Sequence, residues 1–220
     1  MVTGEIYRYA TSVQAYGALK VPPDCTVNWQ CGALVATGLN RAIAEALSNP
    51  SHQWVWIMGD DHAYQDMCVL NLLDRGKDVI APLCLSRVPP LDPFIAIWKG
   101  GEKVGVKRLI DLPCATDTPL YKLGDGETCG DAGMLIRRHV LEAIDYPWYE
   151  TRRTGSLGAD DQEFVRRMIA AGYEVWLDLE NVLGHTTPIT ISPIRKETGW
   201  SIRLDAGTKR LTDLSMTYPE

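Results

Sequence analysis

The sequence lacks several features that would assign it to a common class of protein. It contains no run of about 18 consecutive apolar residues, so no transmembrane helix is expected. The first eight residues have neither the basic nor the apolar region of a signal peptide, which predicts a cytoplasmic protein. The six cysteines form no Cys-x-x-Cys pair and have no zinc-finger spacing, which argues against a structural zinc site and a disulfide framework.

Basic residues are too few for a large nonspecific nucleic-acid surface. The chain has 22 Lys and Arg against 28 Asp and Glu, a net charge of −6. Basic pairs at 137–138 and 152–153 could still line a local groove. Residues 5–20 also lack the Gly-rich loop with basic residues that nucleotidyltransferases place near their first strand.

The first half of the chain alternates strand and helix patterns. Its 220 residues suit one large domain. The residue pattern predicts strands over 5–11, 54–58 and 79–83, and helices over 33–47 and 67–75. This alternation predicts an α/β domain with a mainly parallel central sheet flanked by helices.

The second half has a different pattern. We expect strands near 94–98, 104–110, 132–137 and 174–179, and helices over 139–144 and 160–171. After His185 the chain is polar and irregular, and residues 188–220 are interpreted as either a lid or a disordered tail. The whole of 1–220 is therefore expected to form a single domain.

Two adjacent carboxylates and an imidazole follow the apolar run at 54–58. These residues are Asp60, Asp61 and His62, directly after Gly59. They would lie at the carboxyl end of a buried strand, where open α/β sheets bind ligands. Adjacent carboxylates repel each other unless a cation or a shared proton compensates, so a divalent metal with a phosphorylated ligand is one explanation. A turn leading to a helix N-cap is the other.

Two further polar sites lie later in the chain. Asp160 and Asp161 stand at the start of the helix that carries Phe164, where the helix dipole favours carboxylates and Asp is a good N-cap. His185 follows the last predicted strand. A single histidine is often structural, so each site alone has a non-catalytic explanation.

Taken in order, these motifs resemble the GT-A glycosyltransferases, especially the family 2-like members. The resemblance covers residues 30–187, and five segments carry it: 54–62, 130–138, 160–164, 171–173 and 184–185. It implies a GT-A-like (Rossmann-type) fold in which residues 1–110 bind a nucleotide sugar and residues 111–187 bind the acceptor and carry catalysis. The implied reaction transfers a sugar from a nucleoside-diphosphate sugar, with a UDP-sugar as the first guess, to a soluble acceptor hydroxyl.

The resemblance also implies roles for individual residues. Asp61 and His185 would hold Mn²⁺ or Mg²⁺, while Asp161 would act as the base of an inverting reaction and Asp160 would orient the sugar or acceptor. Gly59 departs from the usual DxD motif, because it stands where the first acidic residue is expected. The remaining substrate contacts would be Asp60, His62, Thr11, Asn40, Arg41, Gly133, Arg195 and Lys196.

Two other functions share parts of this pattern. A nucleotidyltransferase would use the same kind of sheet and metal, and a non-catalytic nucleotide-sugar or carbohydrate-binding module would bind the donor without turnover. Small enzymes of the resembled type occur in bacteria and phages. The acceptor could therefore be a saccharide or a hydroxylated DNA base, in the cytoplasm of a bacterium or of a phage-infected host cell.

Overall fold

The computed structural model describes most of the chain. The residues that it describes are 2–3, 10–31, 34–87, 91–114, 117–150, 161–187, 189–196, 199–206 and 209–215. Asp160 lies outside these ranges, as does the basic pair at 152–153. Within them, no helix is both long enough and apolar enough to cross a lipid bilayer.

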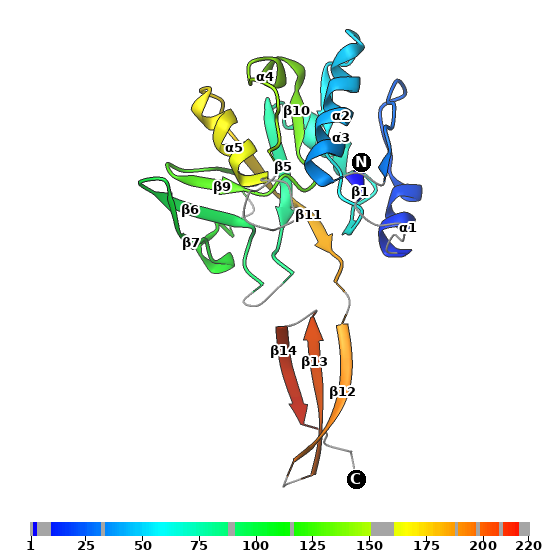
Figure 1. Ribbon diagram of the computed structural model, residues 1–220, viewed down its shortest axis with the longest axis vertical. Coiled ribbons are helices and arrows are strands. Elements are labelled where there is room, and N and C mark those ends of the chain that lie inside the picture. The colour runs from blue at the N-terminus through cyan, green and yellow to red at the C-terminus, as the bar shows by residue number, and fades with distance from the viewer. Residues whose placement is uncertain are drawn as a thin grey trace.

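A six-stranded sheet forms the centre of the fold (Figure 1). Its strands are β3 (Trp54–Trp56), β4 (His62–Ala63), β5 (Val79–Cys84), β8 (Leu120–Lys122), β10 (Leu135–Arg137) and β11 (Trp176–His185). The order is β3-β10-β5-β11-β4, with β8 also paired to β11. Only the β11–β5 pair is parallel within this described sheet, because β10 is antiparallel to β3 and β5, and β4 and β8 are antiparallel to β11.

The prediction of a mainly parallel, Rossmann-type sheet is therefore wrong. Strands β3 and β5 were expected to belong to a parallel sheet with right-handed crossovers. Instead β10 enters between them in the opposite direction and pairs with both. The result is a mixed sheet, and the alternation of strand and helix along the first half could not reveal it because β10 comes from the second half.

Among the described residues, strand β3 lies at the edge of this sheet, whereas the sequence predicted a strand buried on both faces. All three of its residues are half-buried. Two of them are tryptophans: the Arg137 guanidinium lies 4.6 Å from the Trp54 ring, and Trp56 packs edge-on against the buried Tyr64. An apolar run rich in aromatic residues thus does not require burial on both faces.

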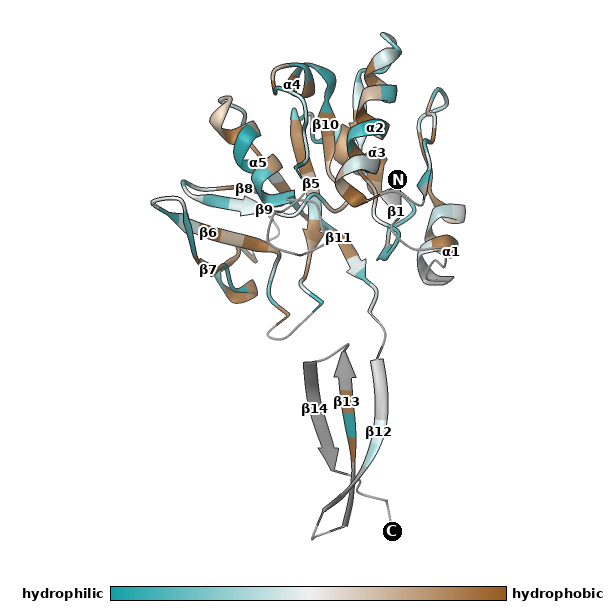
Figure 2. Cartoon of the chain, in the orientation of Figure 1, coloured by the Kyte–Doolittle hydropathy of each residue, from teal (hydrophilic) through white to brown (hydrophobic). Residues whose placement is uncertain are grey.

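Both faces of the central strands are covered by helices. The helices are α1 (Ala10–Ala18), α2 (Val35–Ser48), α3 (Cys68–Asp74), α4 (Arg138–Glu142) and α5 (Asp161–Ala170). Side chains alternate across a strand, so Val79 and Ala81 join the core formed with α2, α4 and α5, while Ile80 joins the core formed with α3. Figure 2 shows the apolar residues concentrated on these central strands. The predicted helices over 33–47, 67–75 and 160–171 are confirmed, with ends shifted by one or two residues.

Three smaller sheets complete the described fold. Strands β6 (Ile95–Lys99), β7 (Glu102–Val106) and β9 (Glu127–Cys129) form an antiparallel sheet beside a short 3₁₀ helix at Leu109–Asp111. Strands β1 (Val2–Thr3) and β2 (Gln30–Cys31) pair in parallel.

The C-terminal segment forms strands where an irregular lid or tail was expected. Strands β12 (Ile189–Lys196), β13 (Gly199–Ala206) and β14 (Lys209–Ser215) make an antiparallel sheet. Figure 1 shows this sheet standing away from the rest of the chain, with β12 leading away from β11. Arg195 and Lys196 lie at the far end of β12, so the backbone does not bring them to the end of β11.

Candidate active site

Strand pairing brings the first acidic cluster to His185. Strand β4 pairs antiparallel with the end of β11, which places His62 opposite His185 and Ala63 opposite Gly184. The backbone N–H of Thr186 donates to the carbonyl of Asp61 at 2.7 Å. Two segments more than 120 residues apart therefore meet at the carboxyl end of β11.

The Asp61 carboxylate is surrounded by three nitrogen-bearing side chains. Its Oδ1 lies 2.8 Å from His62 Nδ1, and its Oδ2 lies 3.3 Å from His185 Nε2 and 2.9 Å from Arg87 Nη1. Burial alone raises the pKa of Asp61, but the close approach of the His185 and His62 imidazoles outweighs burial and holds that pKa well below its ordinary value. The carboxylate is thus ionised and available as a ligand.

The backbone fixes which nitrogen of His185 faces Asp61. Nδ1 lies 2.8 Å from the carbonyl oxygen of Leu85, which can only accept, so Nδ1 carries the hydrogen. In a neutral imidazole, Nε2 then presents a lone pair to the Asp61 carboxylate at 3.3 Å. Two acceptors facing each other require a proton or a cation between them. Metal-bound histidines commonly donate their other N–H to a carbonyl in this way.

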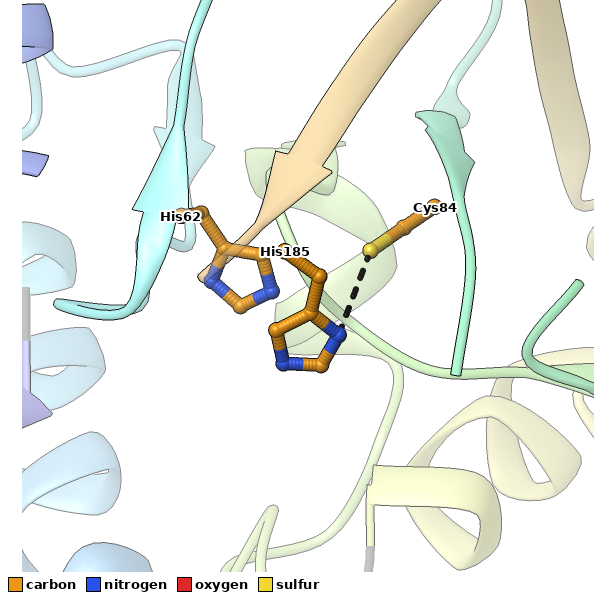
Figure 3. Close-up of side chains that lie close together, drawn as sticks. All are labelled: His62, Cys84 and His185. Atoms are coloured by element: carbon orange, nitrogen blue, oxygen red, sulfur yellow. Dashed lines mark hydrogen bonds between the residues drawn. The ribbon is translucent and has the colours of Figure 1, made fainter. Parts of the chain in front are cut away.

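His62 lies beside His185 with a nitrogen that is not satisfied. The two rings stack with centroids 4.5 Å apart and an interplanar angle of 24°, and Figure 3 shows them side by side at the ends of β4 and β11. The His62 residue is 7% exposed. Its Nε2 has no hydrogen-bond partner among the described residues, and its Nδ1 approaches Asp61 without hydrogen-bond alignment. A buried unsatisfied nitrogen costs about 1–3 kcal/mol, so this position suits a ligand.

Gly59 provides the space that the His62 ring occupies. A Cβ at residue 59 would lie 2.6 Å from His62 Nδ1 and 3.1 Å from Asp61 Oδ1. A side chain here would therefore displace the imidazole from the carboxylate. Packing of the His62 ring thus excludes a side chain at Gly59.

A pocket of about 210 Å³ joins this cluster to the second acidic site. His62, Arg87, His185, Asp131 and Asp161 are among the residues that line it. Typical small-molecule pockets measure about 300–1,000 Å³, so this pocket is small for its class.

Asp161 enters the pocket from the first turn of α5. Its Oδ1 accepts the backbone N–H of Gln162 at 2.9 Å, which keeps the carboxylate at the amino end of the helix dipole. A Cβ at Gly130 would lie 2.3 Å from Phe94 Cδ1 and 3.2 Å from Asp161 Oδ2. The glycine therefore lets the Phe94 ring and the Asp161 carboxylate share this wall of the pocket.

Asp131 is a pocket residue that the sequence analysis missed. Its Oδ2 accepts the hydroxyl of Tyr149 at 2.5 Å. Burial raises the pKa of Asp131 above its ordinary value, and the Tyr149 hydrogen bond offsets this effect only in part. Asp131 follows Gly130 in the segment 130–138. This segment is one of the five that carry the resemblance, so the resemblance could have indicated Asp131.

Asn40, which was predicted to contact the nucleotide, holds the backbone of Tyr149 in the structure. The Asn40 side chain is buried, and its Nδ2 donates to the carbonyl of Tyr149 at 2.8 Å while its Oδ1 accepts the Tyr149 N–H at 3.0 Å. Both amide groups are therefore used to hold the backbone of Tyr149. The neighbouring Arg41 is exposed on α2 and does not line the pocket.

The other predicted substrate contacts are dispersed. Asp60 is half-buried in the turn before β4, and Thr11 lies in α1. Gly133 adopts a φ of 67° at a site where a Cβ would lie 2.8 Å from Pro82 Cγ, and its carbonyl accepts the Trp56 indole N–H at 2.7 Å. Gly133 therefore has a turn-forming role next to the pocket residue Ala132.

Arg87 and Cys84 are further pocket residues that the sequence analysis missed. Both follow the predicted strand at 79–83. The rule that open α/β sheets bind ligands at the carboxyl ends of their strands could therefore have found them, as it found Asp61. Cys84 Sγ lies 3.8 Å from His185 Nδ1 (Figure 3). The same nitrogen contacts the Leu85 carbonyl. Burial and the Asp61 charge raise the pKa of the Cys84 thiol to about 12.

The basic pairs at 137–138 and 166–167 do not form a groove. Arg137 pairs with Asp78 at 3.1 Å, and Arg166 pairs with Glu163 at 2.6 Å. Arg138 and Arg167 instead hold backbone carbonyls: Arg138 donates to Leu47 at 2.7 Å, and Arg167 donates to Trp148 at 3.2 Å. These cations stabilise the fold instead of presenting a row of charges to a phosphate backbone.

Comparisons with known proteins give evidence about the fold only. No protein-family model matches the sequence, and no curated protein matches it significantly. One solved structure with a similar fold is the crystal structure of A197 from STIV, with a TM-score of 0.50 and 13% sequence identity over 89% of this chain and 96% of that chain. At this identity the likeness concerns architecture, so function must be argued from the residues of the pocket.

Proposed function

We propose that the protein is a glycosyltransferase that moves a sugar from a nucleoside-diphosphate sugar to an acceptor hydroxyl. One observation carries this proposal: the three polar motifs, which are far apart in the sequence, converge on one pocket. Asp161 and His185 line the pocket, and Asp61 contacts His185 and two other lining residues, His62 and Arg87. Acidic residues, imidazoles and an arginine in one cavity suit a substrate with a sugar and a diphosphate.

The donor set at Asp61 fits a divalent metal ion. His185 Nε2 lies 3.3 Å from the Asp61 carboxylate, and Nε2 of His62 is buried without a hydrogen-bond partner among the described residues. Asp61 and His185 would hold the ion. When bound, it would neutralise the negative charge that develops on the leaving diphosphate. Arg87, which now contacts Asp61 at 2.9 Å, offers a second cation for the same phosphate groups.

Asp161 is the proposed general base. Its carboxylate accepts the proton of the acceptor hydroxyl while the hydroxyl oxygen forms a bond to the anomeric carbon. The bond from that carbon to the diphosphate oxygen breaks, and its electron pair leaves with the nucleoside diphosphate. Attack from the side opposite the leaving group inverts the anomeric centre. The amino end of α5 favours the ionised form of Asp161 that this role requires.

A saccharide hydroxyl is the acceptor that the charges favour. The net charge is −6, and the described arginine pairs are engaged with carboxylates or backbone carbonyls. A DNA acceptor would require several cations free to contact phosphates. The pocket instead presents Asp131 and Asp161, whose carboxylates can accept hydrogen bonds from sugar hydroxyls.

The test combines a donor screen with one isosteric variant. The full chain would be incubated with UDP-sugars and other nucleotide sugars, a saccharide panel and Mn²⁺, Mg²⁺ or Co²⁺, and the products identified by mass spectrometry. Asp161→Asn keeps the shape of the side chain and removes its basicity. We expect it to bind donor normally by calorimetry and to lose transfer by about 10²-fold or more. Glu163→Gln on the same helix is the matched control, because Glu163 pairs with Arg166 outside the pocket lining.

Two results would contradict the proposal. Donor binding with no transfer to any acceptor, unaffected by Asp161→Asn, would favour the non-catalytic binding module. Release of diphosphate from a nucleoside triphosphate, with no reaction of nucleotide sugars, would identify a nucleotidyltransferase.

A further inference from the structure

We propose that His62 is a third metal ligand beside Asp61 and His185, and that the site binds a first-row transition-metal ion in preference to Mg²⁺. The inference deepens the proposed function, because it concerns the ligand set of the same pocket. It can be tested without any sugar substrate, since metal binding is measured directly.

The first argument comes from the contacts around the carboxylate. His62 and His185 approach different oxygens of Asp61, at 2.8 Å and 3.3 Å, and their rings stack 4.5 Å apart. One carboxylate and two imidazoles therefore present donor atoms to one small volume. The His62 ring is buried, and its Nε2 has no hydrogen-bond partner among the residues that the structure describes. The ring therefore contacts Asp61 through Nδ1, and its Nε2 is left to coordinate an ion.

The second argument comes from Gly59. A Cβ at this position would meet the His62 ring at 2.6 Å and 2.9 Å. The glycine is thus the residue type that lets an imidazole approach the Asp61 carboxylate. A DxD motif would have an acidic side chain at this position, whereas here the His62 ring occupies that space beside Asp61.

The ligand types determine the preferred metal. Carboxylate and water oxygens suit Mg²⁺ and Mn²⁺, whereas imidazole nitrogen suits Zn²⁺, Fe²⁺ and other later first-row ions. Two imidazoles and one carboxylate also form the open three-ligand sets of catalytic zinc and non-haem iron sites. We therefore expect Zn²⁺, Co²⁺ or Fe²⁺ here, in place of the Mn²⁺ or Mg²⁺ that the resemblance implies.

Cys84 is a competing donor that the geometry places outside this set. Its Sγ and nitrogens of His62 and His185 lie within 4.8 Å of one another. However, Cys84 approaches Nδ1 of His185, whose hydrogen is donated to the Leu85 carbonyl at 2.8 Å. Asp61 faces the other nitrogen, Nε2. An ion on the Asp61 side is therefore bound by a different edge of the ring from the one that Cys84 faces.

The experiment titrates the metal-stripped full chain with Co²⁺, followed by visible absorption, and with Mg²⁺, followed by calorimetry. We expect one Co²⁺ per chain and an affinity at least about 10²-fold above that for Mg²⁺. His62→Phe keeps a stacked ring and removes the nitrogens. It should lower the Co²⁺ affinity by at least about 10²-fold, because losing even an outer partner of a ligand costs about 10–100-fold. Cys84→Ala is the matched control in the same pocket and should leave the Co²⁺ affinity unchanged.

A spectroscopic readout separates ligation from folding. In the Co²⁺-loaded protein, two paramagnetically shifted, exchangeable imidazole N–H signals are expected by NMR, and one in His62→Phe. His62→Gln, with circular-dichroism melts of each variant, checks that the loss does not arise from unfolding.

Three results would overturn the inference. They are an unchanged Co²⁺ affinity in folded His62→Phe and His62→Gln, an equal affinity for Mg²⁺, and a thiolate-to-Co²⁺ charge-transfer band that Cys84→Ala removes. Co²⁺ binding with two imidazole signals but no sugar transfer would support this inference and contradict the proposed function.

Discussion

Replacing Asn40 by alanine tests whether this residue holds the fold or contacts a nucleotide. The Asn40 amide makes two buried hydrogen bonds to the backbone of Tyr149, at 2.8 Å and 3.0 Å. Removing the amide leaves both the N–H and the carbonyl of Tyr149 without these partners. An orphaned buried polar group costs about 1–3 kcal/mol, so the free energy of unfolding should fall by about 3 kcal/mol.

The assay is urea unfolding followed by tryptophan fluorescence, with a thermal melt beside it. For a chain of this size each kcal/mol lowers Tm by about 2–4 °C, so the expected shift is about 6–12 °C. Asn49→Ala is the matched control, since Asn49 is exposed and accepts the backbone N–H of Ser51 at 3.0 Å. We expect the control to lose less than about 1 kcal/mol. If Asn40→Ala is as stable as this control and loses donor affinity instead, the structural role is refuted and the nucleotide contact is restored.

Two further substitutions test the contacts of the site and of the fold. Gly59→Ala should push the His62 ring off the Asp61 carboxylate and weaken Co²⁺ binding by about 10-fold or more. Gly105→Ala is the control, because the added Cβ meets open space, and it should leave Co²⁺ binding unchanged. Equal Co²⁺ affinities of the two variants would show that the His62 ring does not bind metal. Glu127 pairs with Lys107 at 2.7 Å, and although burial opposes it, this contact lowers the Glu127 pKa. The Glu127–Lys107 ion pair therefore stabilises the folded protein fully above about pH 4.3, and this stabilisation is lost as the pH falls below that value. Glu127→Gln should cost about 2 kcal/mol in urea unfolding at pH 7, with a smaller cost near pH 3; a cost that does not change with pH would contradict the ion pair.

Helices and acidic clusters could be predicted because their signals are local. The apolar spacing of α2 and α5 follows the 3.6-residue period, and Asp161 favours the start of a helix through its own side chain and charge. Strands β5 and β10 were also visible as short apolar runs. For these features, sequence neighbours are also neighbours in space.

Strand pairing could not be predicted in the same way. An apolar run predicts a strand but neither its direction nor its partner strand. Strands pair through backbone N–H and C=O groups, which nearly all residue types share. The insertion of β10 between β3 and β5 and the pairing of β4 with β11 are contacts between distant segments. A rule based on alternation therefore gave the wrong sheet.

For the candidate site, too, some features follow from the sequence alone and others only from the tertiary structure. By itself the sequence determined which residue types are present and in what order: Asp61 after a strand, Asp161 at a helix start and His185 after the last strand. Only the tertiary structure decided which of them meet, because β4 pairs with β11 and sets His62 against His185. It also decided that Asn40 is occupied by Tyr149, since a side chain's burial and hydrogen-bond partners depend on segments that the chain brings together only when it folds.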